Sequence, residues 1–139
     1  MQRSVTKSFD GDDSQNSYPS HHCLALQQEI NAKMRRTLID WLVDVHLKYK
    51  LLPETLFICV NLIDRFSSKS LIKRKDYQLV GVTCMLIAAK YEEIYPPYVD
   101  NFVYITDHAY RREQIIEKER EILEELEFDI TFVTAYRLL

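Results

Sequence analysis

The segment from Leu79 to Ala89 reads LVGVTCMLIAA, contains no charged residue and lies within sequence of helical period. A helix that is apolar on every side must be surrounded by other elements. The segment is also shorter than the roughly 20 residues that span a bilayer. It therefore predicts the central helix of a folded domain. Four small residues in it predict neighbouring helices packed close against this helix: Gly81, Cys84, Ala88 and Ala89.

Size and composition point to one all-α domain. The chain has 139 residues, of which 47% are apolar, and this suits a single domain with a substantial core. The sequence has 2 glycines, far apart, so it lacks the clustered glycines of phosphate-binding loops. A net charge of −3 argues against nucleic-acid binding as the main activity. No β-type alternation extends beyond a few residues, which predicts an all-α fold.

Helical periodicity predicts five helices between turn signals. They cover about residues 34–50, 53–67, 75–94, 98–103 and 111–126. A lead-in segment, 24–32, is expected to add a turn or a short helix. Residues 1–23 are rich in Ser, Asp, Gln and Asn and are expected to form a flexible N-terminal tail. The domain is expected to cover 24–130, and 131–139 is expected to start a linker or a further helix.

A charged residue interrupts the apolar face of each of the first two helices. Arg35 projects into the middle of the apolar arc of the first helix. A buried guanidinium is costly unless it is paired. Asp64 projects from the apolar face of the second helix, so we expect Arg35 and Asp64 to form a structural ion pair.

Lys90 and Glu119 present a similar anomaly with two interpretations. Lys90 directly follows the uncharged segment, and Glu119 lies in the apolar stripe of the fifth helix, between Ile115 and Leu123. The two residues either pair with each other inside the fold or lie at the edge of an apolar patch and face a partner. Charges at the edge of a patch set the orientation of an interface. The residue pattern alone favours neither interpretation.

Catalytic and metal-binding patterns are weak, and a binding module is expected rather than an enzyme. The sequence has no HExxH motif and no Gly-framed Ser elbow. His21, His22 and Cys23 lie in the expected tail without the fixed geometry of a zinc site, so neither metal nor cofactor is expected. Cys59 and Cys84 fall in apolar helices and are expected to be core residues. Three cysteines without a secretory signal favour a reducing, intracellular compartment.

Four segments of the chain carry a family resemblance. They are MRRTLIDWLVDVH from Met34, ETLFICVNLIDRF from Glu54, QLVGVTCMLIAAKYEEIYPP from Gln78 and FVYITDHAY from Phe102. In these segments and their spacing, residues 28–139, about four-fifths of the chain, resemble the N-terminal cyclin box of a mitotic cyclin. The resemblance is to the A- and B-types and is closer to the B-type. It implies the five-helix cyclin fold with a central third helix, as a single box without the second box of a standard cyclin.

The resemblance also implies roles for individual residues. The family's five signature positions fall on Arg35, Asp64, Leu79, Lys90 and Glu119. It implies that Arg35 and Asp64 are the internal pair and that Lys90 and Glu119 face a kinase. Further apolar contacts with the kinase are implied for Leu86, Ile87, Tyr91, Leu123, Phe128 and Ile130.

The function implied by the resemblance is that of a kinase regulator. Cyclins are regulatory subunits of cyclin-dependent Ser/Thr protein kinases. A chain of this kind docks on the kinase αC helix, activates the kinase and controls cell-cycle progression, here in mitosis. We expect it in the nucleus and cytoplasm, with neither nucleic acid nor membrane as a partner. The alternative is a cyclin-fold scaffold or a transcription-type binding module that activates no kinase.

A second site implied by the resemblance is the hydrophobic patch that docks Arg-x-Leu motifs of substrates and inhibitors. Its residues would be Met34, Leu38, Trp41, Asp44 and Gln78. Asp44 would face the cation of the motif. The sequence departs from the family pattern here, because Thr37 replaces the usual apolar residue and Arg36 the usual Ala. The competing interpretation is that this stripe belongs to the core.

Overall fold

The computed structural model describes residues 24–129, and all regular elements in this range are helices. They are α2 (Ala32–Lys48), α3 (Pro53–Ser67), the 3₁₀ turn η1 (Arg74–Asp76), α4 (Tyr77–Glu92), α5 (Val99–Ile105) and α6 (Arg112–Glu125). The expected all-α architecture with five α-helices is confirmed for the described residues. The expected tail, 1–23, and the expected linker or helix start, 131–139, lie outside them.

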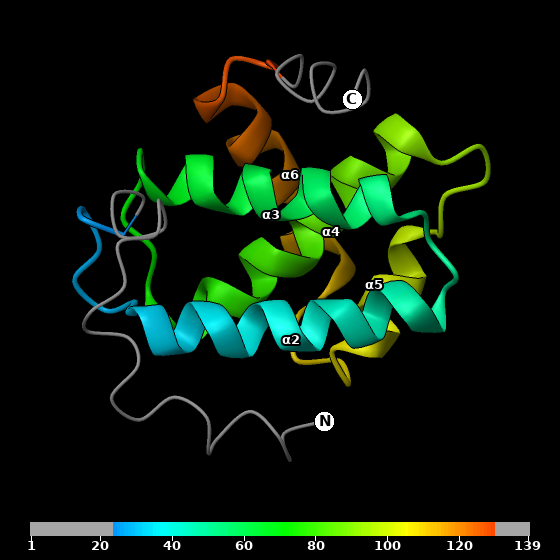
Figure 1. Cartoon of the computed structure of the whole chain (residues 1–139), viewed down its shortest axis with the longest axis horizontal. Coiled ribbons are helices and arrows are strands. Elements are labelled where there is room, and N and C mark those ends of the chain that lie inside the picture. The colour runs from blue at the N-terminus through cyan, green and yellow to red at the C-terminus, as the bar shows by residue number, and fades with distance from the viewer. Residues whose placement is uncertain (1–23, 130–139) are drawn as a thin grey trace.

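Helix α4 occupies the centre of the domain. Helices α2 and α3 lie antiparallel, and α4 crosses behind them (Figure 1). It contacts α2, α3, α5 and α6. Every residue from Leu79 to Ala89 is buried. The prediction of a central helix from the uncharged segment is therefore confirmed.

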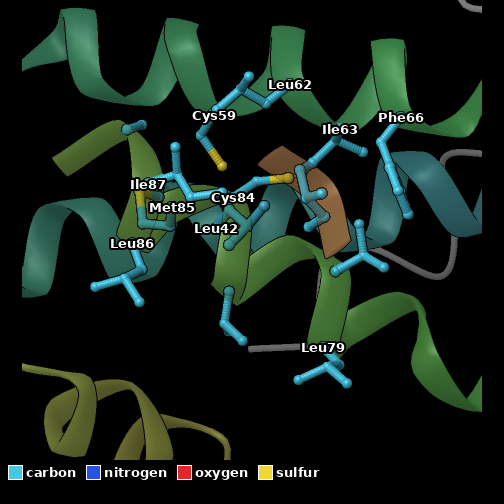
Figure 2. Packing of buried hydrophobic residues seen from close by; sticks show 14 of the residues in the cluster. Leu42, Cys59, Leu62, Ile63, Phe66, Leu79, Cys84, Met85, Leu86 and Ile87 are labelled. Atoms are coloured by element: carbon cyan, nitrogen blue, oxygen red, sulfur yellow. The ribbon is translucent and has the colours of Figure 1, made fainter. Parts of the chain in front are cut away.

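Two neighbouring helices, α2 and α3, pack closely against α4. Cys59, Ile63 and Phe66 point from α3 toward α4 (Figure 2) and are buried. On the α2 side, a Cβ atom added at Gly81 would lie 2.8 Å from Cδ1 of Leu38. Gly81 thus marks a point of close helix approach, as its size predicted.

Helix α2 starts earlier than expected. The Oδ1 atom of Asn31 accepts a hydrogen bond from the N–H of Met34 at 2.8 Å, so Asn31 caps a helix that begins at Ala32. The start of α4 also moved, because residues Arg74–Asp76 form a 3₁₀ turn and α4 begins at Tyr77 instead of at 75. Local capping chemistry and the tight turn account for both differences.

Helix α3 begins at Pro53, as expected, but receives its cap from another part of the chain. Its N-cap residue, Leu52, has no side chain that could accept a hydrogen bond. The Oε2 atom of Glu93, just after α4, accepts from the Leu52 N–H and from the Thr55 hydroxyl, each at 2.6 Å. Glu93 therefore joins the end of α4 to the start of α3.

The connection between α3 and α4 is held by the lead-in segment. This segment contains a turn at residues 24–26, within the expectation of a turn or a short helix. Gln27 donates to the carbonyls of Ser67 and Ser70 at 2.6 Å each and accepts from the Ile72 N–H at 2.9 Å. The side-chain amide of Gln27 thus fixes the backbone of the connection on three sides.

Two further side chains hold the end of this connection. The Oε1 atom of Glu29 accepts the N–H of Arg74 at 2.8 Å. The hydroxyl of Tyr110 donates to the carbonyl of Lys75 at 2.7 Å. Together with Gln27, these residues fix the backbone of 72–75 through contacts to main-chain atoms alone.

Candidate functional site

Arg35 and Asp64 form the ion pair that the sequence predicted. The Nε and Nη2 atoms of Arg35 donate to the two carboxylate oxygens of Asp64 at 2.8 Å and 2.7 Å. Their side chains are 21% and 26% exposed. The pair joins α2 to α3 in a bidentate geometry, which is the strong form of this interaction.

Lys90 and Glu119 pair with each other and also reach the surface. The Nζ atom of Lys90, in the last turn of α4, lies 2.6 Å from Oε2 of Glu119 on α6. The Lys90 side chain is 48% exposed and that of Glu119 is 16% exposed. The pair uses one N–H of the ammonium and one carboxylate oxygen. Both residues can therefore bind a partner without breaking the contact between them, so the two interpretations are compatible.

The other residues expected at a kinase interface differ in exposure. Tyr91 and Phe128 are exposed, and Leu123 is half-buried. Leu86 and Ile87 are 1% and 4% exposed, so they belong to the core and offer little surface to a partner in this conformation. Ile130 lies outside the described residues. Ile116, also on α6, is exposed.

A cavity adjoins Lys90 on the side of the α4–α5 connection. Its volume is about 540 Å³, and Leu86 lines it together with Lys90. The remaining lining residues come from the connection and α5: Ile94, Tyr95, Pro96, Pro97, Tyr98, Val99 and Asn101. Ile94, Tyr95 and Tyr98 are strongly exposed. The Lys90–Glu119 pair thus has exposed apolar and aromatic side chains near it, a combination typical of protein interfaces.

A second hollow, of about 540 Å³, follows α2, and we call it the docking groove. Met34, Leu38, Trp41 and Gln78, all expected in the hydrophobic patch, line it. Asp44, the fifth expected residue, is not among the lining residues, and Leu38 is mostly buried. Five further residues complete the lining: Asn31, Lys33, Thr37, Arg74 and Tyr77. The stripe therefore contributes both to the core and to an open groove.

Thr37 makes part of the groove wall polar. Its hydroxyl donates to the carbonyl of Lys33 at 3.0 Å, within the same helix. The methyl group remains for apolar contact, but the wall is shorter than one with a larger aliphatic side chain.

The buried cysteines are core residues in this structure. Cys59 and Cys84 are free thiols and fully buried. Burial is the main factor that raises the pKa of both thiols above the ordinary value. Both therefore remain protonated and are weak nucleophiles and metal ligands.

Residues 24–129 contain neither a metal-binding cluster nor a membrane-spanning helix. No group of three or more His, Cys, Asp or Glu side chains there is arranged to hold a metal ion. No helix of this range has the length and apolar character needed to cross a membrane. His21, His22 and Cys23 lie outside the described residues.

Sequence reasoning missed the residues that support these surfaces. Glu93 follows Lys90 as the second of two adjacent acids, which gives no sign of a special role. Gln27 and Glu29 lie in a segment without a clear hydrophobic period. Their partners are about 40 residues away in the sequence, so local periodicity carried no signal for them. Asn31 was different, because a cap residue three positions before Met34 is a readable helix start.

Comparisons with known proteins agree with this architecture. A sequence profile described as "Cyclin, N-terminal domain" matches residues 6–131. Cyclin-B1-4 of Arabidopsis thaliana is 53% identical over 113 residues, which are 81% of this chain and 29% of that protein. The G2/mitotic-specific cyclin S13-7 of Glycine max is 47% identical over 123 residues, which are 88% of this chain and 48% of that protein. The chain thus spans between about a quarter and a half of the length of these relatives.

A solved structure shows the same fold. The viral cyclin from herpesvirus saimiri superposes with a TM-score of 0.75, over 79% of this chain and 48% of that chain. Its sequence identity is 24%, so the likeness concerns the fold. The five described α-helices, with α4 at their centre, therefore form a cyclin fold. The profile match over most of the sequence and the B-type relatives near 50% identity lead to one assignment: the chain belongs to the cyclin family.

Proposed function

We propose that this chain is a regulatory subunit that binds and activates a cyclin-dependent Ser/Thr protein kinase. The single observation that carries the proposal is the Lys90–Glu119 pair at the junction of α4 and α6, in which the Lys90 side chain is 48% exposed and that of Glu119 is 16% exposed. An ion pair of this exposure contributes about 0–1 kcal/mol to stability. The fold has little need of it, whereas an interface can use its remaining donors and acceptor.

The mechanism follows from what the two side chains offer. Lys90 would donate its free N–H groups to backbone carbonyls of the kinase, and Glu119 would accept from kinase N–H groups. Exposed Tyr91 and Phe128 would add apolar contact around them. Because the chain would bind one orientation of the kinase αC helix better than the others, it would shift the kinase toward that state. The inward αC position brings a Glu to the catalytic Lys of the kinase, which carries out the chemistry.

We propose that this chain acts in mitosis, a stage that the B-type relatives support, and that it is located in the nucleus and cytoplasm. One of these relatives carries "G2/mitotic-specific" in its name. Imaging of the tagged chain through a synchronised cell cycle tests both points. A protein level that stays constant through the cycle contradicts the mitotic role, and a signal outside the nucleus and cytoplasm contradicts the location.

The docking groove along α2 would recruit substrates or inhibitors with Arg-x-Leu motifs. Met34, Trp41 and Gln78 line an open hollow that an apolar side chain can enter. Asp44 lies one helical turn beyond Trp41, where it can attract the cation of the motif. This second surface is separate from the Lys90–Glu119 pair.

The test is a pull-down and phosphorylation assay with cyclin-dependent kinases. We expect the wild-type chain to bind and activate at least one of them. Lys90→Ala with Glu119→Ala should lower affinity at least ten-fold and shift the melting temperature little, because the pair contributes little to stability.

The matched control is Lys118→Ala with Glu121→Ala. It removes another ion pair, of 3.0 Å, on α6 and should leave kinase binding unchanged. Unfolding of the Lys90/Glu119 variant would indicate a structural role for the pair. If the wild-type chain binds no such kinase, the chain is a cyclin-fold scaffold instead.

A further inference from the structure

We propose that the docking groove takes a peptide with three successive chemistries: a cation, apolar residues and then an anionic group. The anionic group would bind the basic ridge, which we define as Lys73, Arg74 and Lys75. The inference rests on the proposed docking of Arg-x-Leu motifs. The inference adds to that motif an anionic group, which the motif itself does not contain.

Residues of the basic ridge line two hollows. Arg74 lines the docking groove, and so does Lys33 from the start of α2. Lys73 and Lys75 line a second hollow of about 370 Å³, to which Lys118 contributes from α6. Arg74 and Lys75 lie in a 3₁₀ turn, where consecutive side chains diverge by about 120°. One short segment can therefore present cations to both hollows.

The ridge and the nearby Lys33 carry cations without acid partners among the described residues. Lys33, Lys73, Arg74 and Lys75 are exposed, and within residues 24–129 none of their side chains forms an ion pair. These four cations line the docking groove and the second hollow of a chain whose net charge is −3. A local excess of one charge on a molecule of opposite sign favours an anionic partner at that place.

The carboxylates near the ridge offset only part of this charge. Glu29 accepts the backbone N–H of Arg74, and Glu121 pairs with Lys118 at 3.0 Å. Asp76 lines the second hollow beside Lys73 and Lys75. Apart from Lys118, which pairs with Glu121, two lysines therefore face one carboxylate in this hollow. Lys33 and Arg74 face the groove, whose lining includes no carboxylate.

The backbone of the ridge is already ordered without a ligand. Gln27, Glu29 and Tyr110 hold it through the Ile72 N–H, the Arg74 N–H and the Lys75 carbonyl. An anion that binds there orders side chains but not the chain itself, which lowers the entropic cost of binding. All three hydrogen bonds involve backbone atoms of 72–75, so substitution of the basic side chains leaves this clamp in place.

The order of the three chemistries follows from the geometry of α2. Asp44 lies 11 residues after Lys33, which corresponds to about 16 Å along the helix. An extended peptide covers this distance in about five residues. If the Arg of an Arg-x-Leu motif faces Asp44, the third to fifth residues after its Leu reach Lys33 and the ridge.

The test measures the affinity of fluorescent peptides for the full chain at low salt. A reference peptide contains Arg-x-Leu followed by neutral residues. Two others carry Glu or phosphoserine at the third to fifth positions after Leu, and a fourth carries Glu before the Arg. We expect a gain of about five-fold for anions after Leu, no gain for anions before Arg, and loss of the gain at high salt.

The decisive variant is Arg74→Gln with Lys75→Gln. It should abolish the gain and leave the affinity for the neutral peptide unchanged. Arg120→Gln, an exposed cation on α6, is the control for net charge and should retain most of the gain. A gain from phosphoserine alone would identify a phosphorylated partner, and a gain from both peptides would show that carboxylates suffice.

Three results would overturn the inference. They are equal affinity of the neutral and anionic peptides, a gain that persists in the Arg74/Lys75 variant, and no binding of any peptide. Each is distinguishable from failure of the proposed function, because kinase binding through Lys90 and Glu119 is measured in a separate assay. A chain that binds the kinase but gains nothing from an anion keeps its proposed function and loses only the ridge.

Discussion

At the scale of single residues, the pair of Arg35 and Asp64 is the most informative interaction. Two hydrogen bonds of 2.8 Å and 2.7 Å join side chains that are only partly exposed. Removing one partner leaves the other charge partly buried and unpaired, which is costly. A double-mutant cycle of Arg35→Gln and Asp64→Asn should therefore give a coupling of about 1–3 kcal/mol in chemical denaturation.

The control for this cycle is the exposed pair of Arg112 and Asp100. Its closest atoms are 3.3 Å apart, and both side chains are mostly exposed. Such a pair should couple by less than about 0.5 kcal/mol. Equal coupling in the two pairs would mean that burial adds nothing to the contact of Arg35 and Asp64.

The residues that could be predicted were those whose position conflicted with their chemistry. Arg35 lay on an apolar helical face, so it required an acid, and Asp64 was the suitable one. Glu93 gave no such signal, because an acid after the end of a helix is ordinary. Its role depends on the tertiary fold, which brings it within 2.6 Å of the Leu52 N–H.

At the scale of elements, the start of α3 depends on α4. Leu52 has no capping side chain, and Glu93 supplies one across 41 residues. Loss of a helix cap costs about 0.5–2 kcal/mol. We expect Glu93→Ala to lower the free energy of unfolding by about 1–2 kcal/mol, as measured by thermal or chemical denaturation.

Glu125→Ala is the matched control for the cap. Glu125 is an exposed acid at the last position of α6, where the helix dipole disfavours a negative charge. Its loss should be neutral or slightly stabilising. If the Glu93 and Glu125 variants have the same free energy of unfolding, water replaces the Glu93 carboxylate as the cap of α3 at no cost.

The positions of the helices could be predicted well, and their ends less so. The sequence placed α4 at the centre because its eleven consecutive uncharged residues give the helix no polar face to turn toward solvent. The period does not report hydrogen bonds at the ends. The 3₁₀ turn at Arg74–Asp76 and the cap at Asn31 therefore moved the starts of α4 and α2.

At the scale of the whole molecule, the two buried thiols report global unfolding. Burial raises the pKa of Cys59 and Cys84, so at pH 8 the folded state holds both as thiols, and the thiolate is the reactive form. In a Cys23→Ser variant, labelling by a thiol reagent should be slow without denaturant. The rate should rise in proportion to the unfolded fraction as denaturant is added.

The comparison for this measurement is the same variant in its denatured state, where both thiols label at the rate of free cysteine. Rapid labelling of one thiol under native conditions would reveal a local opening between α3 and α4. Equal slow rates for both would show that these two helices separate only when the whole domain unfolds.

The clamp on residues 72–75 has a consequence for the order of folding. Its hydrogen bonds join positions 45, 45 and 35 residues apart in the sequence. Contacts between such distant positions form only after the intervening loops have closed, which is slow and entropically costly. The helices should therefore assemble around α4 first, and the basic ridge should acquire its shape among the last parts of the domain.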